Sequence, residues 1–275
     1  MSAITVEGVR PKKKTSPRKR AQRIRFVQYG VLALVVLLAV LFVDGRQVSS
    51  AFFRLDLIEK TLTQGLPLAF LNTLAMTGGA FVVGLVLGTV LALMRLSQVA
   101  PYRWLSMIYI EFFRGLPALI VLMGFSLVSL AFPGLRIPLD PYGTVWLGLG
   151  LVSSAYIAET IRAGIQAVPK GQVEAARSLG MPSGMATRRI VLPQAFRIVT
   201  PPLTNELVAL TKDSSLVYVI GLTATSFDLT KYGRAMSNTY SNMTPLVIAG
   251  ATYLLITLPL TFLVRRMEAR GARAK

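Results

Sequence analysis

Long apolar runs alternate with short polar segments along most of the chain. A helix of about 20 apolar residues crosses the hydrocarbon core of a bilayer, and these runs approach or exceed that length. The pattern predicts an all-α polytopic membrane protein with about six transmembrane helices. The predicted crossings are residues 26–43, 67–94, 116–132, 142–162, 194–226 and 245–264.

Prolines and glycines refine this pattern. The pair Pro201-Pro202 is expected to break the fifth crossing, because proline removes a helical hydrogen bond. Residues 95–132 are too long for one crossing, so we expect an interfacial helix over 101–114 ahead of the third. The spacing of Gly84 and Gly88 is typical of a helix that packs closely against a neighbour.

Basic residues predict the orientation. With both ends inside, the inner segments hold 20 lysines and arginines and the outer segments hold 6, which favours cytoplasmic termini. We expect residues 1–25, which carry nine of these cations, to be a disordered cytoplasmic tail, and 266–275 to be a second basic tail. A specific site for anionic lipid within 1–25 is the alternative. The run 26–43 is longer than the apolar core of a signal peptide, so we expect a retained helix.

Composition narrows the chemistry. Of the 275 residues, 53% are apolar and 15% are charged, and the chain has no cysteine and no histidine. Thiol nucleophiles, Ser-His-Asp triads and Cys/His metal sites are therefore excluded, and no metal site is expected. No glycine is followed directly by lysine, which excludes the phosphate-binding loop G-x-x-x-x-G-K-[ST]. The net charge is +18, and the basic residues lie between apolar runs. Their placement predicts orientation in a lipid membrane and not binding to nucleic acid.

The inner segment 163–193 is longer than a simple connector needs to be. Residues 172–179 have a helix-forming composition, and Gly180 is placed to cap that helix. A second short helix is expected to begin at Ser183, acting as its cap, and to end at Pro193. The sequence therefore predicts a helix-turn-helix outside the bilayer, which is typical of a docking surface.

This inner segment carries a motif with the spacing E-A-A-x3-G-x9-I-x-L-P. The motif resembles the cytoplasmic loop of binding-protein-dependent ABC importer permeases. In that family the loop forms coupling helices, which rest in a groove of the ATPase subunit and transmit its closure to the membrane helices. The residues expected to couple to the ATPase are Glu174, Ala175, Ala176, Gly180, Ile190, Leu192 and Pro193.

The resemblance covers residues 65–265 and extends to the polar amino acid branch of the family. Its members carry substrates of the glutamate, glutamine, aspartate and basic amino acid class. The branch usually has five helices, so the helix at 26–43 is an addition. The resemblance is carried by Phe113-Arg114-Gly115-Leu116-Pro117 (with Leu where the branch usually has Thr), by Glu159 with Arg162-Ala163-Gly164-Ile165, and by Lys212-Asp213-Ser214-Ser215-Leu216.

The resemblance also implies the partners. Separate ATPase subunits bind ATP and Mg²⁺, a second permease (the same chain or a paralogue) completes the pathway, and an extracytoplasmic binding protein delivers a polar amino acid. The chain itself is expected to hold no cofactor and to have no enzymatic activity. Its expected location is the inner membrane of a bacterial cell.

Charged and polar residues within the predicted helices are candidates for the substrate path, because such groups are costly in lipid and usually face a cavity or a partner. Lys212 is expected to meet a substrate carboxylate, and Glu159, Glu206 or Asp213 to meet its ammonium group. Ion pairs between helices are the alternative role for these charges. The full set of candidates is Glu159, Asn205, Glu206, Lys212, Asp213, Asn72 and Thr73.

Two other functions fit parts of the sequence. An amino acid transporter driven by an ion gradient would use Glu159, Glu206 or Asp213 as proton or sodium sites. That function leaves the structured inner segment unexplained. A membrane scaffold without transport activity would have little use for charges deep in its helices.

Overall fold

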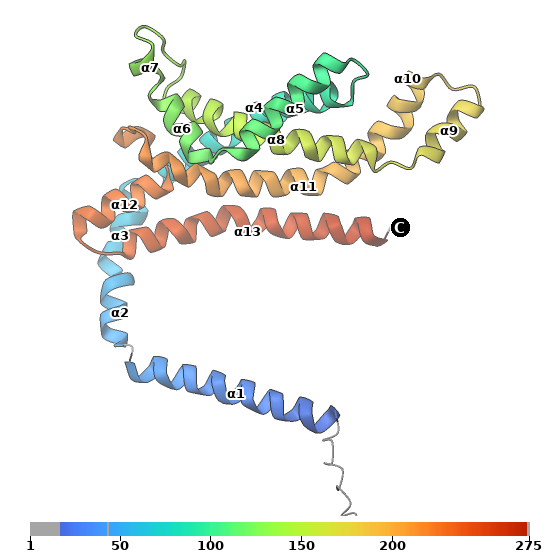
Figure 1. Cartoon of the computed structure of the whole chain (residues 1–275). Helices are drawn as coiled ribbons and strands as arrows, with labels where there is room; N and C mark the ends of the chain where they lie inside the picture. The colour runs from blue at the N-terminus through green and yellow to red at the C-terminus, as the bar shows by residue number, and fades with distance from the viewer. Residues whose placement is uncertain (1–16, 43, 274–275) are drawn as a thin grey trace, which may run out of the picture. The chain divides into compact units, whose positions relative to one another are not determined.

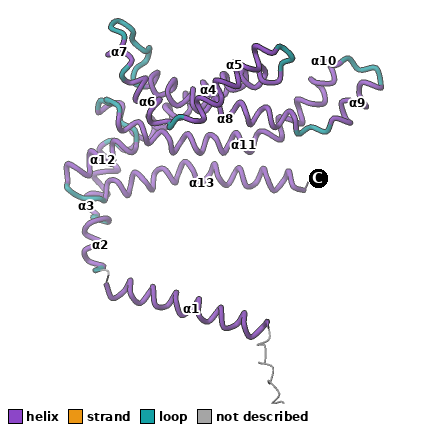
Figure 2. Tube along the Cα trace, viewed as in Figure 1, coloured by secondary structure: helices purple, strands orange, loops and turns teal. Residues whose placement is uncertain are grey.

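The computed structural model describes residues 17–42 and 44–273 (Figure 1). Over these residues the chain consists of helices joined by loops, with no strand (Figure 2). The chain divides into two compact units, with the boundary between Ala51 and Phe52. The prediction of an all-α fold is confirmed.

The N-terminal unit begins with α1 (Pro17–Phe42), followed by α2 (Gly45–Phe52). Within α1, Ala21–Phe42 is long and apolar enough to cross a membrane, as predicted for 26–43, although residue 43 itself lies outside the described residues.

The prediction that residues 1–25 are disordered is wrong for 17–25, which form the first turns of α1. Proline suits the first helical position, and the arginines, Lys19, Ala21 and Gln22 that follow are strong helix formers. Residues 1–16 lie outside the part of the chain that the structure describes.

The C-terminal unit holds the remaining helices. They are α3 (Leu55–Gln64), α4 (Leu66–Leu96), α5 (Ala100–Gly115), α6 (Ala118–Ser126), α7 (Val128–Ala131), α8 (Tyr142–Gln166), α9 (Lys170–Ser178), α10 (Ser183–Ala186), α11 (Leu192–Asp213), α12 (Leu229–Tyr240) and α13 (Thr244–Arg273). A π turn, η1 (Thr187–Val191), joins α10 to α11, and two 3-10 turns, η2 (Ser214–Val219) and η3 (Ala224–Ser226), follow α11. Helix α8 packs against α4, α5, α6 and α11, and α11 also packs along α13 (Figure 1).

Four described helices are long and apolar enough to cross a membrane, namely those in α1, α4, α8 and α13. A fifth crossing results if α5 and α6, which are bent by 98° at a short break, count as one span. Helix α11 has 22 residues, a length of about 33 Å, but it carries charges that lower its hydropathy. It lies along α8 and α13, two of the four membrane-spanning candidates.

Glycines bring α4 and α8 into close contact. A Cβ atom at Gly88 would lie 2.8 Å from both the Ser154 carbonyl oxygen and the Ile157 Cγ2 atom. A Cβ atom at Gly84 would collide with the Ser153 hydroxyl. The predicted role of these two glycines in close helix packing is therefore confirmed.

The separate helix predicted over 101–114, ahead of the third crossing, is present as α5, and its position at the membrane interface stays a prediction. One face of α5 packs against α4 and α8, where Ile110 is buried with Leu91 and Ala155. The Tyr109 hydroxyl donates a hydrogen bond to the Leu151 carbonyl of α8 at 3.2 Å. The charged residues Glu111 and Arg114 of α5 are exposed.

The predicted crossing at 116–132 is also not one continuous helix. It is divided into α6 and the short α7, and the chain bends sharply at Leu116-Pro117 before α6 begins. Pro117 lacks the backbone N–H that would continue α5, and the residue before a proline avoids helical geometry. Leu116 accordingly has an extended backbone with φ −96° and ψ 137°.

Helix α11 runs without a break through Pro201 and Pro202, contrary to prediction. The fixed φ of proline is compatible with a helix, but each proline removes a hydrogen bond and its ring crowds the carbonyl of the preceding turn. Packing along α8 and α13 compensates for that loss, and Gly164 of α8 lies directly against Val199 of α11. The helix ends at Asp213, so the predicted crossing 194–226 is a helix only in its first part, and 3-10 turns follow.

A buried polar network ties α12 to α13. Asp228 is fully buried and caps α12, since its carboxylate accepts hydrogen bonds from the Thr230 and Lys231 backbone N–H groups at 2.9 and 3.1 Å. The Tyr253 hydroxyl of α13 also donates to this carboxylate, at 3.2 Å. Burial raises the pKa of the Asp228 carboxyl.

The Asp228→Ala variant is expected to lower the free energy of unfolding by about 1–3 kcal/mol, because it removes a helix cap and leaves buried donors unpaired. Thermal melting of the purified protein in detergent measures the loss. Asp228→Asn is the matched control, since its amide oxygen still accepts a hydrogen bond and it should melt closer to the native temperature. An alanine variant that melts like the native protein would contradict this role.

Candidate functional site

The inner segment folds into an exposed hairpin, made of α9, α10 and the turn between them (Figure 1). Gly180 has a φ of +84°, which L-amino acids rarely adopt. The Gly180 and Met181 N–H groups donate to the carbonyls of Arg177 and Ala176 at 3.0 and 3.1 Å, which is the Schellman pattern of a helix end. The predicted role of Gly180 as a cap is therefore confirmed.

The motif residues divide between the surface and the interior of the hairpin. Glu174 and Ala175 are exposed, whereas Ala176 is buried. At the turn, Leu179 is 88% exposed. In the part of the chain that the structure describes, the Glu174 carboxylate has no hydrogen-bond or ion-pair partner. The hairpin thus presents a carboxylate and an apolar side chain outward.

The second arm of the hairpin continues directly into α11. From Ser183 to Asp213 the backbone is helical throughout, first as α10, then as η1 and then as α11. Pro193 therefore does not end the helix as predicted, and Ser183 is its first residue and not a side-chain cap. A π turn widens the helix just before Pro193, where a proline would otherwise crowd the preceding turn.

A small apolar cluster anchors this junction. Val191 and Ala195 are buried together with Val168, which lies between α8 and α9. Ile190 is half-buried, while Leu192 and Pro193 are exposed. The hairpin is therefore joined to α11 through both the backbone and side-chain packing.

The second feature is a cavity of about 430 Å³ where the bend between α5 and α6 faces α8 and α11. Glu206 and Asp213, seven residues apart, both line it from α11. Arg114 lines it from the end of α5, with its guanidinium carbon 5.6 Å from the centre of the Tyr156 ring. The cavity therefore combines two carboxylates, one guanidinium and one aromatic ring.

The other charged candidates lie elsewhere. Lys212 lines a separate cavity of about 260 Å³ with Tyr253 and Thr257 of α13, so it does not face Glu206 and Asp213. Glu159 is paired on its own helix with Arg162, with 2.6 Å between Oε2 and Nη2. This pair lies within one helix, so it differs from the pairing between helices that was the alternative role for Glu159.

Three uncharged candidates have different positions. Asn205 is exposed on α11. Asn72 is buried, and its amide nitrogen donates to the carbonyls of Thr225 and Phe227, both at 3.0 Å. Thr73 is also buried and accepts a hydrogen bond from the Leu229 N–H group at 3.0 Å. Asn72 and Thr73 hold the loop before α12 against α4, so we assign them a structural role and withdraw them from the substrate path.

Arg114 is the cavity residue that sequence reasoning did not select. Its motif, Phe113-Arg114-Gly115-Leu116-Pro117, was visible in the sequence, and the proline in it signals the bend. The bend is what turns the end of α5 toward Tyr156 of α8. No local pattern links Arg114 to carboxylates that lie more than 90 residues further along the chain.

The fold and these sites define a multi-pass helical membrane protein with an exposed helical hairpin between two of its long helices. Residues 84–272 match the family described as "Binding-protein-dependent transport system inner membrane component", and the chain belongs to this family. It is therefore a membrane-spanning permease component of an ABC importer, as the hairpin motif predicted.

Curated relatives agree with this assignment. The chain is 40% identical over 190 residues to the arginine transport system permease protein ArtQ of Bacillus subtilis, which covers 69% of this chain and 84% of that one. It is 39% identical to the probable glutamine ABC transporter permease protein GlnM of Bacillus subtilis, over 73% of this chain and 90% of that one. It is 37% identical to the glutamate/aspartate import permease protein GltK of Escherichia coli, with the same coverage.

Solved structures share the fold. One is the crystal structure of an amino acid ABC transporter with histidines, which is 38% identical, has a TM-score of 0.67, and covers 76% of this chain and 96% of that chain. An inward-facing structure of the MetNI methionine ABC transporter shares the fold with a TM-score of 0.59 at 22% identity, covering 77% of this chain and 97% of that one.

Proposed function

We propose that this permease moves a polar amino acid of the glutamate, glutamine, aspartate or basic class into the bacterial cytoplasm. The relatives named for arginine, glutamine and glutamate/aspartate support this substrate class. The excess of lysine and arginine in the inner segments supports cytoplasmic termini and a cytoplasmic hairpin.

ATP is bound and hydrolysed by other chains of the complex. Two ATPase subunits dock on the hairpin and bind ATP and Mg²⁺, while this chain holds no cofactor and makes or breaks no covalent bond. The exposed Glu174 and Leu179 supply the contact surface. A second permease, either another copy or a paralogue, completes the pathway, and an extracytoplasmic binding protein delivers the substrate to the opposite end of the helices.

One observation carries the mechanism, namely the unbroken helical path from Ser183 to Asp213. Closure of the ATPases moves the hairpin, and this path carries the movement along α11 to the cavity at Glu206 and Asp213. Alternation between an outward-facing and an inward-facing arrangement then changes which side of the membrane the cavity opens to.

The cavity charges match an amino acid. Glu206 and Asp213 meet the ammonium or a basic side chain, and Arg114 meets the α-carboxylate. Arg114 replaces Lys212 in the role of the cation, because Lys212 lines a different cavity. The aromatic face of Tyr156 adds a favourable contact for a cationic group.

Uptake by the assembled complex in proteoliposomes tests the proposed function. With ATP on the side of the membrane where the ATPase subunits dock, binding protein on the other side and no ion gradient, the complex is expected to accumulate at least one of arginine, glutamine and glutamate. Accumulation that requires a proton or sodium gradient, and not ATP, would instead establish an ion-coupled transporter.

The substrate role of the cavity predicts a difference between neighbouring residues of α11. Glu206→Gln and Asp213→Asn are each expected to lower uptake about tenfold, which corresponds to about 1.4 kcal/mol of lost interaction. Lys212→Met is the matched control and should retain uptake, because its side chain lines the other cavity. The assignment is wrong if the lysine variant loses uptake while both carboxylate variants keep it.

A further inference from the structure

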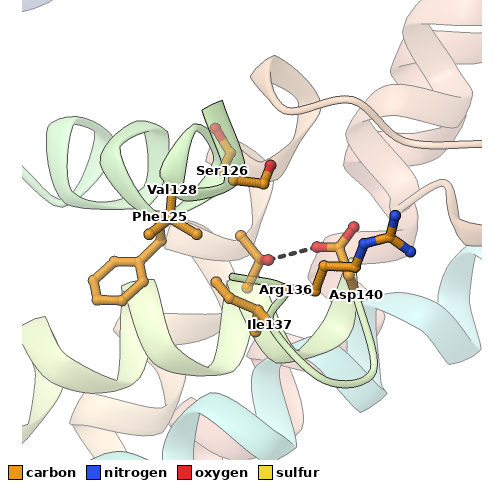
Figure 3. Close-up of a pocket in the computed structure, with 8 residues that line it drawn as sticks. Phe125, Ser126, Val128, Arg136, Ile137 and Asp140 are labelled. Atoms are coloured by element: carbon orange, nitrogen blue, oxygen red, sulfur yellow. Dashed lines mark hydrogen bonds between the residues drawn. The ribbon is translucent and has the colours of Figure 1, made fainter. Parts of the chain in front are cut away.

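A second polar cavity, of about 360 Å³, lies where the loop before α8 meets α6 and α7 (Figure 3). A volume above 300 Å³ is within the range of small-molecule sites. The cavity lies at the start of α8, whereas the hairpin follows the end of α8, so the two are at opposite ends of this helix (Figure 1). It is lined by Phe125, Ser126, Val128, Ser129, Arg136, Ile137, Asp140 and Thr144.

The loop that contributes the charges is held firmly against α8. A Cβ atom at Gly143 would collide with the Pro138 carbonyl oxygen, so only glycine permits this close approach. The Gly143 N–H group donates to the Leu139 carbonyl at 3.0 Å, and Leu139 has a φ of 60°, which is costly for a branched side chain. Such backbone strain is concentrated at functional sites.

The two charged groups of this cavity have hydrogen-bonding capacity that no described residue uses. The Asp140 carboxylate accepts one hydrogen bond, from the Thr144 hydroxyl, which leaves its other lone pairs available. The Arg136 guanidinium has no hydrogen bond or ion pair with any residue that the structure describes. These opposite charges line one cavity without neutralising each other, and both are exposed.

The rest of the lining suits the remainder of a small polar molecule. The Ser129 hydroxyl can donate and accept hydrogen bonds, and the Ser126 hydroxyl, which donates to the Met123 carbonyl at 2.8 Å, can still accept them. Phe125 and Val128 supply an apolar wall from α6 and α7, across the cavity from the loop (Figure 3). A cation, an anion, hydroxyls and an apolar wall together are the groups that recognise a free α-amino acid.

We infer that this cavity is an entry subsite for a zwitterionic α-amino acid, in which Arg136 binds the α-carboxylate and Asp140 binds the α-ammonium. The inference rests on the proposed function, because it assumes that the chain transports amino acids. The subsite receives the substrate on the outer side, before the substrate reaches Glu206 and Asp213. Binding here is weak and brief, because the cavity is open and both charges remain hydrated.

The absence of cysteine from the chain makes a direct test possible, because an introduced cysteine is the only thiol of the permease. Ser129→Cys places a thiol in the cavity, and Leu135→Cys places one on an exposed position of the same outer region outside the cavity. The complex is placed in right-side-out vesicles without binding protein. A membrane-impermeant thiol reagent is then added with arginine, glutamine or glutamate at millimolar concentration.

At least one of the three amino acids is expected to slow the labelling of Ser129→Cys severalfold and to leave Leu135→Cys unaffected. Adding Arg136→Gln to Ser129→Cys should abolish this protection, whereas Arg136→Lys should retain part of it. The inference is overturned if no amino acid protects Ser129→Cys, or if the reagent never reaches it. Protection by loaded binding protein alone would also overturn it and would identify a protein-docking surface instead.

Uptake by the unsubstituted complex in the same vesicles, with ATP inside and the binding protein added outside, distinguishes a failure of the entry subsite from a failure of the proposed function. If ATP-driven uptake occurs but no amino acid protects the cavity thiol, the entry subsite is wrong and the proposed function stands. If the unsubstituted complex accumulates none of the three amino acids, the proposed substrate class itself is wrong.

Discussion

ATP-driven uptake is expected to fall about tenfold when Gly180 is replaced by alanine. The φ of +84° at this position costs an L-residue with a side chain about 1–2 kcal/mol, so the hairpin shape that docks becomes roughly 5- to 30-fold less populated. Both co-purification of the ATPase subunits and uptake in proteoliposomes measure the effect. The membrane helices should melt at the native temperature, because the hairpin extends beyond the bundle.

Gly184→Ala is the matched control for this variant. Gly184 lies four residues along in the same hairpin, inside α10, and an added Cβ would meet nothing within 4 Å. Its uptake should remain near the native level, since alanine favours a helix. Native uptake by Gly180→Ala would show that the turn geometry is not needed for coupling.

Gly88→Ala is expected to destabilise the membrane domain by about 1–3 kcal/mol through overpacking between α4 and α8. The added Cβ would lie 2.8 Å from the Ser154 carbonyl oxygen, which belongs to backbone and yields only if the two helices separate. Thermal melting of the detergent-solubilised complex measures the change, which should be several degrees for a domain of this size. Uptake should fall in parallel, since α8 also contributes Tyr156 to the cavity.

Gly78→Ala on the same helix is the control for packing. A Cβ at Gly78 would meet nothing within 4 Å, so this variant gains helix propensity without a collision and should melt at or above the native temperature. Equal melting of the Gly78 and Gly88 variants would contradict the close approach of α4 and α8.

The hairpin was predictable because its signals are local. Gly180 supplies its own turn conformation, and the motif around Glu174 and Leu192 is contained in about 20 consecutive residues. The end predicted at Pro193 was wrong because local reasoning treats proline as a helix breaker. The π turn from Thr187 to Val191, which accommodates this proline, has no comparable signature in the sequence.

The cavity depends on contacts that sequence periodicity does not report. The pairing of Glu206 with Asp213 on one face followed from their spacing of seven residues. The place of Arg114 beside them depends on the 98° bend after α5 and on the packing of α5 against α8. Lys212 was a candidate because it is a charge within a predicted helix, and only the packing of α11 against α13 shows that it lines a different cavity.

The sequence by itself determined that this is a helical membrane protein, and it predicted which way its ends face and where a partner docks. Those properties follow from hydrophobic runs, charge counts and one turn, all of which act over short stretches of chain. Only the tertiary structure decided which charges share a cavity, that α11 continues through Pro201 and Pro202, and that Asn72 and Thr73 are buried supports. Each of these depends on which helices pack together, and packing joins residues that lie far apart in the chain.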